Sequence, residues 1–389
     1  MIIKDVILKE IKGIWGNPPV EGDLSTPVIK TNNMTYEGYI DYDDITYRSI
    51  PEKKLDSCYL KKGDLLVEKS GGTKTHSVGY VNIFDKENEV FVCNNFIVGL
   101  RPDNNIILSE YLFFQMKFFY ETGIFSDCYN KTTGIQNLQL QTYLSKSIVC
   151  PEKAEQEKVI ATLNNIVKAL ANKNEQLKKL DELIQSKFYE MFGDIVINEK
   201  GWSIKKLDEV GSFARGVSKH RPRNAPELLG GTMPLIQTGD IANAGMYITT
   251  YSSTYSELGV RQSKVWPAGT ICITIAANIG KCSILTFDAC FPDSVVGYTI
   301  KQGEINDVFV YYLFGELQGI LEANAPGVAQ KNINLQTLNS LAVPLPPLPL
   351  QQAFASYVEK VEEAKAIVNK EIAHLQELLD SRMDFYFRK

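Results

Sequence analysis

The feature of this sequence that most constrains its fold is an internal repeat, because duplicated segments fold into similar units. Residues 137–156 read NLQLQTYLSKSIVCPEKAEQ, and residues 332–351 read NINLQTLNSLAVPLPPLPLQ. Matching residues stand 195 positions apart, and this offset continues without a gap as far as Phe192 and Phe387. The chain therefore reads as two copies of one unit, whose natural symmetry is a pseudo-two-fold within one polypeptide.

Upstream of these segments the repeat is weaker. PVIKTNNM at Pro27 resembles PLIQTGDI at Pro234, and GDLLVEKSGG at Gly63 resembles GTICITIAAN at Gly269. The offset there drifts to about 206, which indicates loops of different length in the two copies. Each half is expected to be a globular block of about 150 residues followed by a helix of about 37 residues.

The globular blocks are predicted to be α+β. Short apolar runs at residues 90–98 and 271–276 are bounded by Gly, Asn and Asp, which is typical of strands and turns. Residues 109–123 and 307–321 have a helical pattern, and their aromatic residues are expected in the core.

The segments that follow the blocks carry apolar residues at alternating steps of four and three, which predicts a left-handed coiled coil. Lys187 and Arg382 occupy equivalent positions in this seam, where they either fix the register, mark a contact with another chain, or lie near a helix end with their charges in solvent. The pseudo-two-fold requires the two helices to run antiparallel. The seam positions are Val159, Leu163, Ile166, Leu170, Lys173, Leu177, Leu180, Ile184, Lys187 and Met191 in the first copy, and Phe354, Val358, Val361, Lys365, Val368, Ile372, Leu375, Leu379, Arg382 and Tyr386 in the second.

Composition narrows the class of protein. The sequence has no apolar run long enough for a membrane span and no signal-peptide pattern at its start, so we expect a soluble cytoplasmic protein. Its seven cysteines are scattered, which predicts free thiols rather than disulfides or a zinc site. The net charge of −5 means that any nucleic-acid surface has to be local.

Motifs for catalysis or cofactor binding are missing. The sequence has three histidines, none with a nucleophile or metal partner at motif spacing, and lacks complete nucleotide-binding loops. His374 is expected at a solvated position of the second long helix. Asn17-Pro18-Pro19-Val20 resembles the motif of adenine methyltransferases, but Val20 replaces the aromatic residue that would stack on a flipped base. We therefore expect no catalytic activity, no metal and no cofactor in this chain.

Several loops combine basic, amide and hydroxyl side chains, which are the groups that contact phosphates and base edges. The alternatives are solvated charges and ordinary loop capping. The candidate DNA-binding residues are Lys69, Lys74 and Thr75; Lys131, Gln136 and Asn137; Arg215, Lys219, Arg221 and Arg223; Asn278 and Lys281; and Gln330, Lys331 and Asn332.

The order of these segments resembles the specificity subunits of type I restriction-modification systems. GWSIKKLDEVGSFARG at residues 201–216 is similar to the opening of a target recognition domain, and residues 234–241 and 269–284 are similar to its next two blocks. The exit at residues 325–352 leads into the second heptad helix. The first block lacks the GW-x-x-KKL opening, and Leu350-Gln351 stands where the first copy has Glu155-Gln156.

The resemblance implies a target recognition domain at residues 1–151, a central conserved helix at 152–192, a second target recognition domain at 193–346 and a C-terminal conserved helix at 347–389. It implies a non-catalytic subunit that reads a bipartite, asymmetric site in double-stranded DNA. It further implies docking of methyltransferase subunits, expected to be two, and of restriction subunits through them. S-adenosylmethionine, ATP and Mg²⁺ would belong to these partners.

Two other classes of protein remain open at this point. One is a methyltransferase or nuclease with its own activity, which methyl transfer by the purified chain would reveal. The other is a coiled-coil adaptor that binds no DNA, which a gel shift with the methyltransferase partner would reveal.

Overall fold

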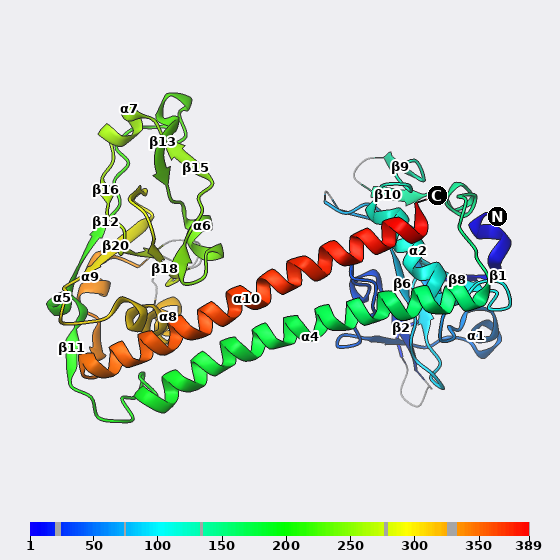
Figure 1. The fold of residues 1–389 in the computed structure, drawn as a ribbon, viewed down its shortest axis with the longest axis horizontal. Helices are drawn as coiled ribbons and strands as arrows, with labels where there is room; N and C mark the ends of the chain where they lie inside the picture. Colours follow the sequence, from blue (N-terminus) through cyan, green and yellow to red (C-terminus); the bar gives the residue numbers. More distant parts are fainter. Residues whose placement is uncertain (20–24, 74, 133–134, 276–278, 325–332, 389) are drawn as a thin grey trace. The chain divides into compact units, whose positions relative to one another are not determined.

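The computed structural model describes residues 1–19, 25–73, 75–132, 135–275, 279–324 and 333–388. The chain forms two compact units. Unit 1 comprises Met1–Asn174 and Lys370–Lys389, and unit 2 comprises Glu175–Asn369. Each unit contains one globular block together with a part of each long helix (Figure 1).

Unit 1 is built on a four-stranded antiparallel sheet with the order β1-β8-β4-β6. All four side chains of β4 are buried, because the helix α2 covers one face and a second small core lies on the other. Its elements are η1 (Ile3–Val6), β1 (Ile7–Lys12), β2 (Thr26–Ile29), η2 (Thr31–Asn33), β3 (Thr46–Arg48), α1 (Glu52–Cys58), β4 (Leu65–Glu68), β5 (Ser70–Gly71), β6 (Val81–Ile83), β7 (Val92–Cys93), β8 (Ile97–Pro102), α2 (Ser109–Glu121), β9 (Tyr129–Thr132), β10 (Ile135–Leu138) and α3 (Leu140–Leu144).

Unit 2 repeats this plan with the sheet order β12-β20-β17-β18, to which β14 adds an edge strand. A further four-stranded sheet has the order β15-β13-β19-β16. Its elements are β11 (Ile204–Lys206), α5 (Leu207–Val210), β12 (Gly211–Arg215), η3 (Pro226–Leu228), β13 (Leu229–Leu235), α6 (Thr238–Asn243), β14 (Tyr247–Ile248), β15 (Ser253–Tyr255), α7 (Glu257–Arg261), β16 (Val265–Trp266), β17 (Ile271–Thr274), β18 (Cys282–Leu285), β19 (Ala289–Cys290), β20 (Val295–Ile300), α8 (Asp307–Asn324), α9 (Leu335–Asn339) and β21 (Ala342–Pro344).

The structure confirms the α+β class and the helices expected at residues 109–123 and 307–321. Tyr111, Phe113, Phe114, Phe118 and Phe119 of α2 are buried, so the aromatic residues of this helix form core, as expected.

The two long helices, α4 (Lys153–Phe192) and α10 (Leu348–Phe387), contribute to both cores in the same way. In unit 1 the first turns of α4 and the last turns of α10 pack together, and in unit 2 the roles are exchanged (Figure 1). The buried side chains of the two helices match at the repeat offset. They are Val159, Leu163 and Ile166 with Leu379, Met383 and Phe387 in unit 1, and Phe354, Val358 and Val361 with Ile184, Phe188 and Phe192 in unit 2. The predicted seam is wrong by one residue at four of these positions, because Phe188, Phe192, Met383 and Phe387 are buried instead of Lys187, Met191, Arg382 and Tyr386.

Within unit 2 the two helices are antiparallel. The Lys365 Nζ atom lies 2.7 Å from Asp181 Oδ1, whereas the Phe354 ring, earlier in α10, packs 5.4 Å from the ring of Phe192, later in α4. In unit 1, Lys173 of α4 pairs with Glu371 of α10 at 2.6 Å. The expected antiparallel coiled-coil pairing is confirmed.

The polar seam residues divide into two kinds. Lys173 and Lys365 pair with carboxylates of the opposite helix. Lys187 instead pairs with Glu190 of its own helix at 2.8 Å, and Arg382 is exposed. Three interpretations of Lys187 and Arg382 were open. This placement agrees with the one in which both side chains lie near a helix end with their charges in solvent.

A buried glutamine anchors the start of each long helix. Gln156 Oε1 accepts a hydrogen bond from the Leu108 N–H at 2.8 Å, and its Nε2 donates to the Pro151 carbonyl at 2.8 Å. Gln351 makes the same two bonds, accepting from the Asn306 N–H at 2.9 Å and donating to the Pro346 carbonyl at 2.7 Å. The two exit segments therefore share the glutamine, Gln156 or Gln351, and its hydrogen bonds, whereas the residue before it, Glu155 or Leu350, differs between them.

The seven cysteines are free, as expected, and all but the half-buried Cys150 are buried. Burial raises the pKa of the Cys93 thiol to about 12, which disfavours its reactive thiolate form. Among the described residues no helix is long and apolar enough to cross a membrane.

Candidate nucleic-acid interface

In unit 1 the structure brings together two loops that are separated in the sequence. β5 pairs with β10, so that Ser70 lies opposite Asn137 and Gly71 opposite Gln136. The Ser70 hydroxyl donates to Asn137 Oδ1 at 2.7 Å, and the Leu138 N–H donates to the Lys69 carbonyl at 2.8 Å. The candidate residues Lys69, Gln136 and Asn137 thus lie on two segments, residues 69–71 and 136–138, that are side by side in the fold.

The same backbone contact recurs in unit 2. The Ile333 N–H donates to the Ile275 carbonyl at 3.0 Å, at the repeat positions of Leu138 and Lys69. Lys281 follows on the same hairpin and is exposed. Lys74, Asn278, Gln330, Lys331 and Asn332 lie outside the described residues, and Lys131 is described only as part of the backbone of β9.

Gln136 is buried, with 8 % of its surface exposed. Its Oε1 accepts from the Val78 N–H at 3.1 Å, and its Nε2 donates to the Thr73 carbonyl at 3.4 Å. The amide therefore holds both sides of the loop at residues 72–78, and its effect on a ligand would pass through the position of that loop.

The loop requires its two glycines. Gly71 and Gly72 have φ angles of +131° and +71°, a region that L side chains rarely adopt. A Cβ on Gly71 would also lie 2.6 Å from Glu68 Oε1. Glu68 is buried beneath the loop, and this burial raises the pKa of its carboxyl group.

A partly exposed pair of aromatic rings beside this loop could not be predicted from the sequence. The rings of Tyr36 and His76 are stacked with centroids 3.7 Å apart and planes inclined by 14°. The Thr75 hydroxyl lies 3.0 Å from His76 Nδ1. Tyr36 is 42 % exposed, so the pair presents a flat surface of the kind on which bases or sugars stack. No motif spacing connects residues 40 positions apart, which is why sequence reasoning missed Tyr36.

In unit 2 the basic side chains of residues 215–223 fall into two groups, those that are bonded to other residues of the protein and those that are exposed without an ion pair. Arg221 donates to the carbonyls of Ser218 and His220 at 2.6 and 2.8 Å, and Arg223 pairs with Asp293 at 2.6 Å. Arg215, at the end of β12, and Lys219 are exposed and have no ion-pair partner within the described part of the chain. These two cations are the ones available to phosphates.

A small pocket of about 180 Å³ adjoins Arg223 and was also missed by sequence reasoning. Amide and hydroxyl groups line it, among them Asn224, Gln237, Thr238 and Ser253. Such groups donate and accept hydrogen bonds at base edges.

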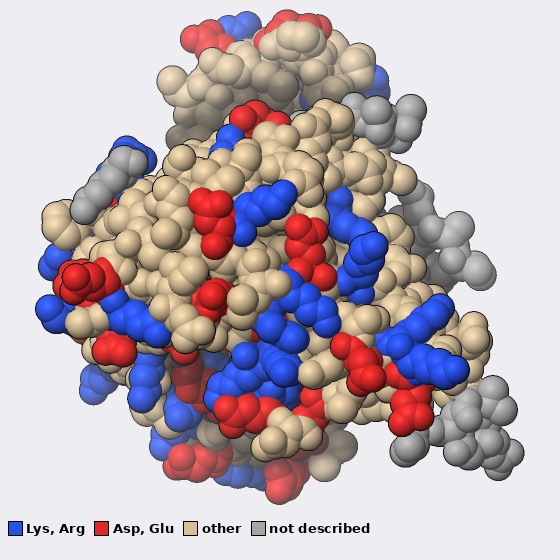
Figure 2. Space-filling view, turned by 90° about the vertical axis from the view of Figure 1, so that its right-hand side faces the viewer, with Lys and Arg blue, Asp and Glu red and all other residues tan. Residues whose placement is uncertain are grey.

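Figure 2 shows Lys and Arg side chains interspersed with Asp and Glu over the face that it presents. The described residues contain no cluster of three or more His, Cys, Asp or Glu side chains that could hold a metal ion. His374 is exposed on α10, as expected.

The family described as type I restriction modification DNA specificity domain matches this chain twice, at residues 17–182 and 199–377. A putative type I restriction enzyme MjaX specificity subunit of Methanocaldococcus jannaschii is 22 % identical over 351 residues, which are 87 % of this chain and 79 % of that protein. The MjaIX specificity subunit of the same organism is 27 % identical over 179 residues, 44 % of this chain and 41 % of that protein.

Two solved structures have a similar fold. One, from a study of complex assembly and conformational transition of the type I R-M system, has a TM-score of 0.60 at 16 % identity and covers 99 % of this chain and 96 % of its own. The other, the S subunit of a type I restriction-modification system from M. genitalium, has a TM-score of 0.56 at 17 % identity and covers 100 % and 95 %.

Proposed function

The chain belongs to the family of type I restriction-modification DNA specificity proteins, whose members are non-catalytic, and we propose that it reads a bipartite, asymmetric site in double-stranded DNA, one half with each unit. The observation that carries this proposal is the repeated loop pair. The Leu138 N–H donates to the Lys69 carbonyl in unit 1, and the Ile333 N–H donates to the Ile275 carbonyl in unit 2, so the same backbone contact occurs in both units. The side chains around this contact differ between the units. Because base edges are recognised by the hydrogen-bonding groups of side chains, two units with a similar backbone and different side chains are expected to recognise different half-sites.

The candidate residues are proposed to act in three ways. Lys69, Lys74, Lys131, Lys281, Lys331, Arg215 and Lys219 would contact phosphates. Thr75, Asn137, Asn278, Gln330, Asn332 and the basic side chains of Arg221 and Arg223 would lie near base edges. Gln136 would position its loop. Phosphate contacts provide affinity with little sequence preference, whereas base-edge contacts provide specificity.

The domain organisation is proposed to follow the repeat, with target recognition domains at residues 1–151 and 193–346 and conserved helices at 152–192 and 347–389. The helices α4 and α10 would act as the spacer that sets the half-site separation. An α-helix of 40 residues is about 60 Å long, and B-DNA rises about 34 Å per turn, so such a spacer would hold two readers on a chosen face of the duplex.

The partners are proposed to be methyltransferase subunits, two per chain, with restriction subunits bound through them. S-adenosylmethionine, ATP and Mg²⁺ would then serve these partners. The chain would work with them in the cytoplasm. Two recognition domains that each bind DNA weakly gain affinity when they are joined in one chain, because binding of the first raises the effective concentration of the second. This arrangement suits a chain whose net charge is −5.

The test is an exchange of residues 193–346 for the corresponding segment of another specificity subunit, followed by sequencing of methylated DNA from cells that contain the methyltransferase partner. We expect one half of the methylated sequence to change and the other half to remain. The matched control exchanges residues 1–151 and should change the opposite half. Methylation that keeps both half-sites after either exchange would refute the proposal.

A further inference from the structure

The first strand of the main sheet ends on a cation in both units. Lys12, at the end of β1, lies opposite Val98 of β8, and Arg215, at the end of β12, lies opposite Val296 of β20. Both side chains are exposed, and neither has an ion-pair partner among the residues that the structure describes. Lys12 is therefore the counterpart in unit 1 of the candidate phosphate contact Arg215.

The segments that follow these two strands have the same backbone course. The Ile14 N–H donates to the Cys93 carbonyl at 2.7 Å, and the Val217 N–H donates to the Phe291 carbonyl at 3.1 Å. A Cβ on the preceding glycine would lie 1.9 Å from a backbone oxygen in unit 1 and 2.3 Å from one in unit 2. The segment at residues 12–17 is therefore the counterpart of the basic segment of unit 2.

The segment in unit 1 carries a tryptophan where unit 2 has Ser218. The Arg48 guanidinium lies over the Trp15 ring, with its Cζ atom 4.2 Å from the ring centroid. Two backbone hydrogen bonds of 3.0 Å between Asn17 and Ser49 hold the two chain segments together. Stacking on the indole face restricts the guanidinium, so its remaining donors keep one direction.

Arg48 has no counter-charge of its own. Its Nε atom is buried without a hydrogen-bond partner, and no carboxylate pairs with its guanidinium in the described part of the chain. In unit 2, by contrast, Asp293 pairs with Arg221 and Arg223 at 3.7 and 2.6 Å, and Asn95 stands at its position in unit 1. A half-buried guanidinium without a counter-charge favours a ligand that accepts hydrogen bonds.

The position of Arg48 corresponds to one wall of the small polar pocket in unit 2. Arg48 is opposite Thr26 of β2, and Tyr255, which lines that pocket, is opposite Met233 of β13. Thr26 and Met233 precede the matching prolines of the repeat. Where unit 2 has amide and hydroxyl groups that suit base edges, unit 1 therefore has a cation.

This site also adjoins the candidate loop of unit 1. Val98 pairs with Lys12 on one side and with Val67 on the other, two residues before the loop begins at Lys69. The Lys69 N–H donates to the carbonyl of the exposed Phe96, in the turn that precedes β8, at 2.8 Å. Lys12 and the candidate loop therefore lie at the same end of the sheet.

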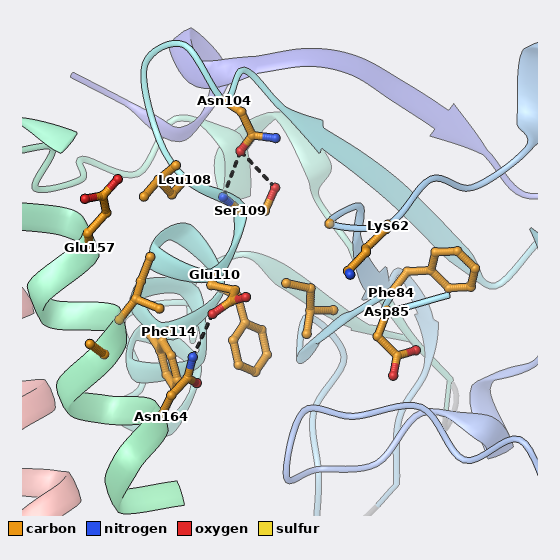
Figure 3. Close-up of a pocket in the computed structure, with 15 residues that line it drawn as sticks. Lys62, Phe84, Asp85, Asn104, Leu108, Ser109, Glu110, Phe114, Glu157 and Asn164 are labelled. Carbon is orange, nitrogen blue, oxygen red and sulfur yellow. Dashed lines mark hydrogen bonds between the residues drawn. The ribbon is translucent and has the colours of Figure 1, made fainter. Parts of the chain in front are cut away.

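Two other pockets are unsuited to DNA. One, of about 630 Å³, lies between the start of α4 and the N-terminus of α2, where Figure 3 shows Glu110 hydrogen-bonded to Asn164. The other, of about 600 Å³, lies between the start of α10 and the N-terminus of α8 and is lined by Glu359 and Glu363. Because carboxylates repel phosphates, neither pocket competes with the site at Arg48 for DNA.

We propose that Arg48 recognises a guanine in the half-site of unit 1, that Trp15 orients its guanidinium, and that Lys12 contacts a phosphate nearby. The inference rests on the proposed function, in which unit 1 recognises one half-site, and it adds a base and the residues that recognise it. Arginine can donate two hydrogen bonds to guanine O6 and N7 in the major groove. An exposed lysine suits a phosphate, which requires no fixed orientation.

The experiment measures binding of the full chain, with its methyltransferase partner, to duplexes in which each base pair of the methylated site is replaced in turn. Arg48→Ala is expected to lower affinity for the intact site about 5- to 150-fold and to abolish the preference at one G·C pair. Arg48→Lys keeps the charge without the planar fork, so it should lose the same preference and retain the salt dependence.

Modified DNA tests the contact without any change in the protein. A duplex with 7-deazaguanine at that pair lacks the N7 acceptor. It should bind the unmodified chain more weakly than the guanine duplex does, whereas Arg48→Ala should bind both duplexes equally. Folding of each variant is checked by its melting temperature.

The two neighbouring residues have different expected effects. Trp15→Ala should weaken the preference at the same G·C pair, and Trp15→Phe should restore most of it. Lys12→Ala should weaken binding to all duplexes and reduce the slope of log affinity against log salt by about one. The control is Lys61→Ala at the other end of β4, which removes a cation 5.4 Å from the centroid of the Tyr59 ring and should change neither affinity nor preference.

The outcomes separate this inference from the proposed function. The half-site of unit 1 is the one that changes when residues 1–151 are exchanged. A half-site of unit 1 without a G·C pair, or full discrimination by Arg48→Lys, would overturn the inference and leave the proposed function intact. An equal loss of affinity for all duplexes in Arg48→Ala would make Arg48 a phosphate contact and would also overturn it. If the unmodified complex recognises no bipartite site, the proposed function and the inference fail together.

Discussion

At the residue scale, single buried polar side chains connect segments that are remote in the sequence. Gln156 connects the start of α4 to α2, and Gln136 connects two sides of a candidate DNA-binding loop. A buried hydrogen-bonding group without a partner is destabilising, so removal of either amide affects groups on two segments at once.

The glutamine anchors can be tested in each unit separately. Gln156→Ala leaves the Leu108 N–H and the Pro151 carbonyl without this partner, and Gln351→Ala does so for Asn306 and Pro346. We expect each change to lower the free energy of unfolding by about 2–3 kcal/mol. Hydrogen exchange at residues 106–110 and 304–308 should quicken only in the unit that is altered. The exposed neighbour Gln352→Ala should change stability by less than about 0.5 kcal/mol. Equal exchange in both units would contradict the prediction.

The buried carboxyl group of Glu68 makes the stability of unit 1 depend on pH. Its pKa is raised in the folded protein by burial, so its favourable contribution is present below the pKa of the unfolded chain and is lost as pH rises through the folded value. Glu68→Gln, which stays neutral and keeps an acceptor for the Gly72 N–H, should be more stable than the parent at neutral pH. The gain should shrink towards about pH 4, near the ordinary pKa of glutamate. Urea unfolding across this range is the measurement, and a gain that is independent of pH would reject the assignment.

At the element scale, the long helices owe their pairing to apolar seam residues, with a few ions between them. Phe354, Val358 and Val361 are buried, and Lys365 continues the seam with its ammonium group on Asp181 and Glu362. Burial would lower the pKa of Lys365, but its hydrogen bonds to both carboxylates raise it above the usual value. Apolar burial therefore provides most of the stability, and the ion pair adds a smaller, directional contribution.

A double-mutant cycle measures that contribution. Asp181→Asn, Lys365→Met and the double variant should give a coupling energy of about 0.5–1 kcal/mol, because Asp181 is largely exposed and its charge is screened. The coupling should fall when salt is added. Glu362→Gln with Lys365→Met gives the matching value for the pair within α10. A coupling that is zero at low salt would show that the contact between the helices is not energetically significant.

At the scale of the whole molecule, the repeat produces two units with similar cores and different loops. The cores of both units use matching positions of α4 and α10, whereas residues 69–76 (KSGGTKTH) and their counterparts 275–282 (IAANIGKC) share no identical residue. Two units with a shared core and different loops are suited to the recognition of two different DNA sequences, because binding residues are commonly carried by loops on a rigid scaffold.

DNA binding by the complex with the methyltransferase partner should separate phosphate contacts from base contacts. Arg215→Ala and Lys219→Ala should weaken binding to all sequences and reduce the slope of log affinity against log salt by about one each. Gln237→Ala, in the small pocket beside Arg223, should instead relax one base position and lower specific affinity by about 1–3 kcal/mol. Fluorescence anisotropy over a salt series with wild-type and substituted sites provides both values.

The control for this experiment is the half-site that unit 1 reads, whose preferences should be unchanged by substitutions in unit 2. If binding is unaffected by alanine at Arg215, Lys219, Arg221 and Arg223 in turn, the basic cluster does not face DNA.

Much of the architecture could be predicted because repeats and heptads are properties of residue spacing. The offset of 195 located both long helices, and the steps of four and three identified most of the side chains that pack between them. Near Phe192 and Phe387 the predicted seam is wrong by one residue, because Phe188, Phe192, Met383 and Phe387 are buried in place of the residues that precede them. The candidate loops at residues 69–76 and 131–137 were also found, although nothing in their spacing indicated that they form one surface. Tyr36, the polar pocket beside Arg223 and the pockets at the start of each long helix were missed, since each is assembled from distant segments.

The sequence by itself determined that this protein has two like units and two heptad helices, because self-similarity and periodicity are written along the chain. Only the tertiary structure decided that Gln156 faces Leu108, that Tyr36 stacks on His76, and that the start of each long helix forms a pocket with a second helix. Such contacts depend on how sheets and helices bring remote residues together in space, and local spacing carries no information about that.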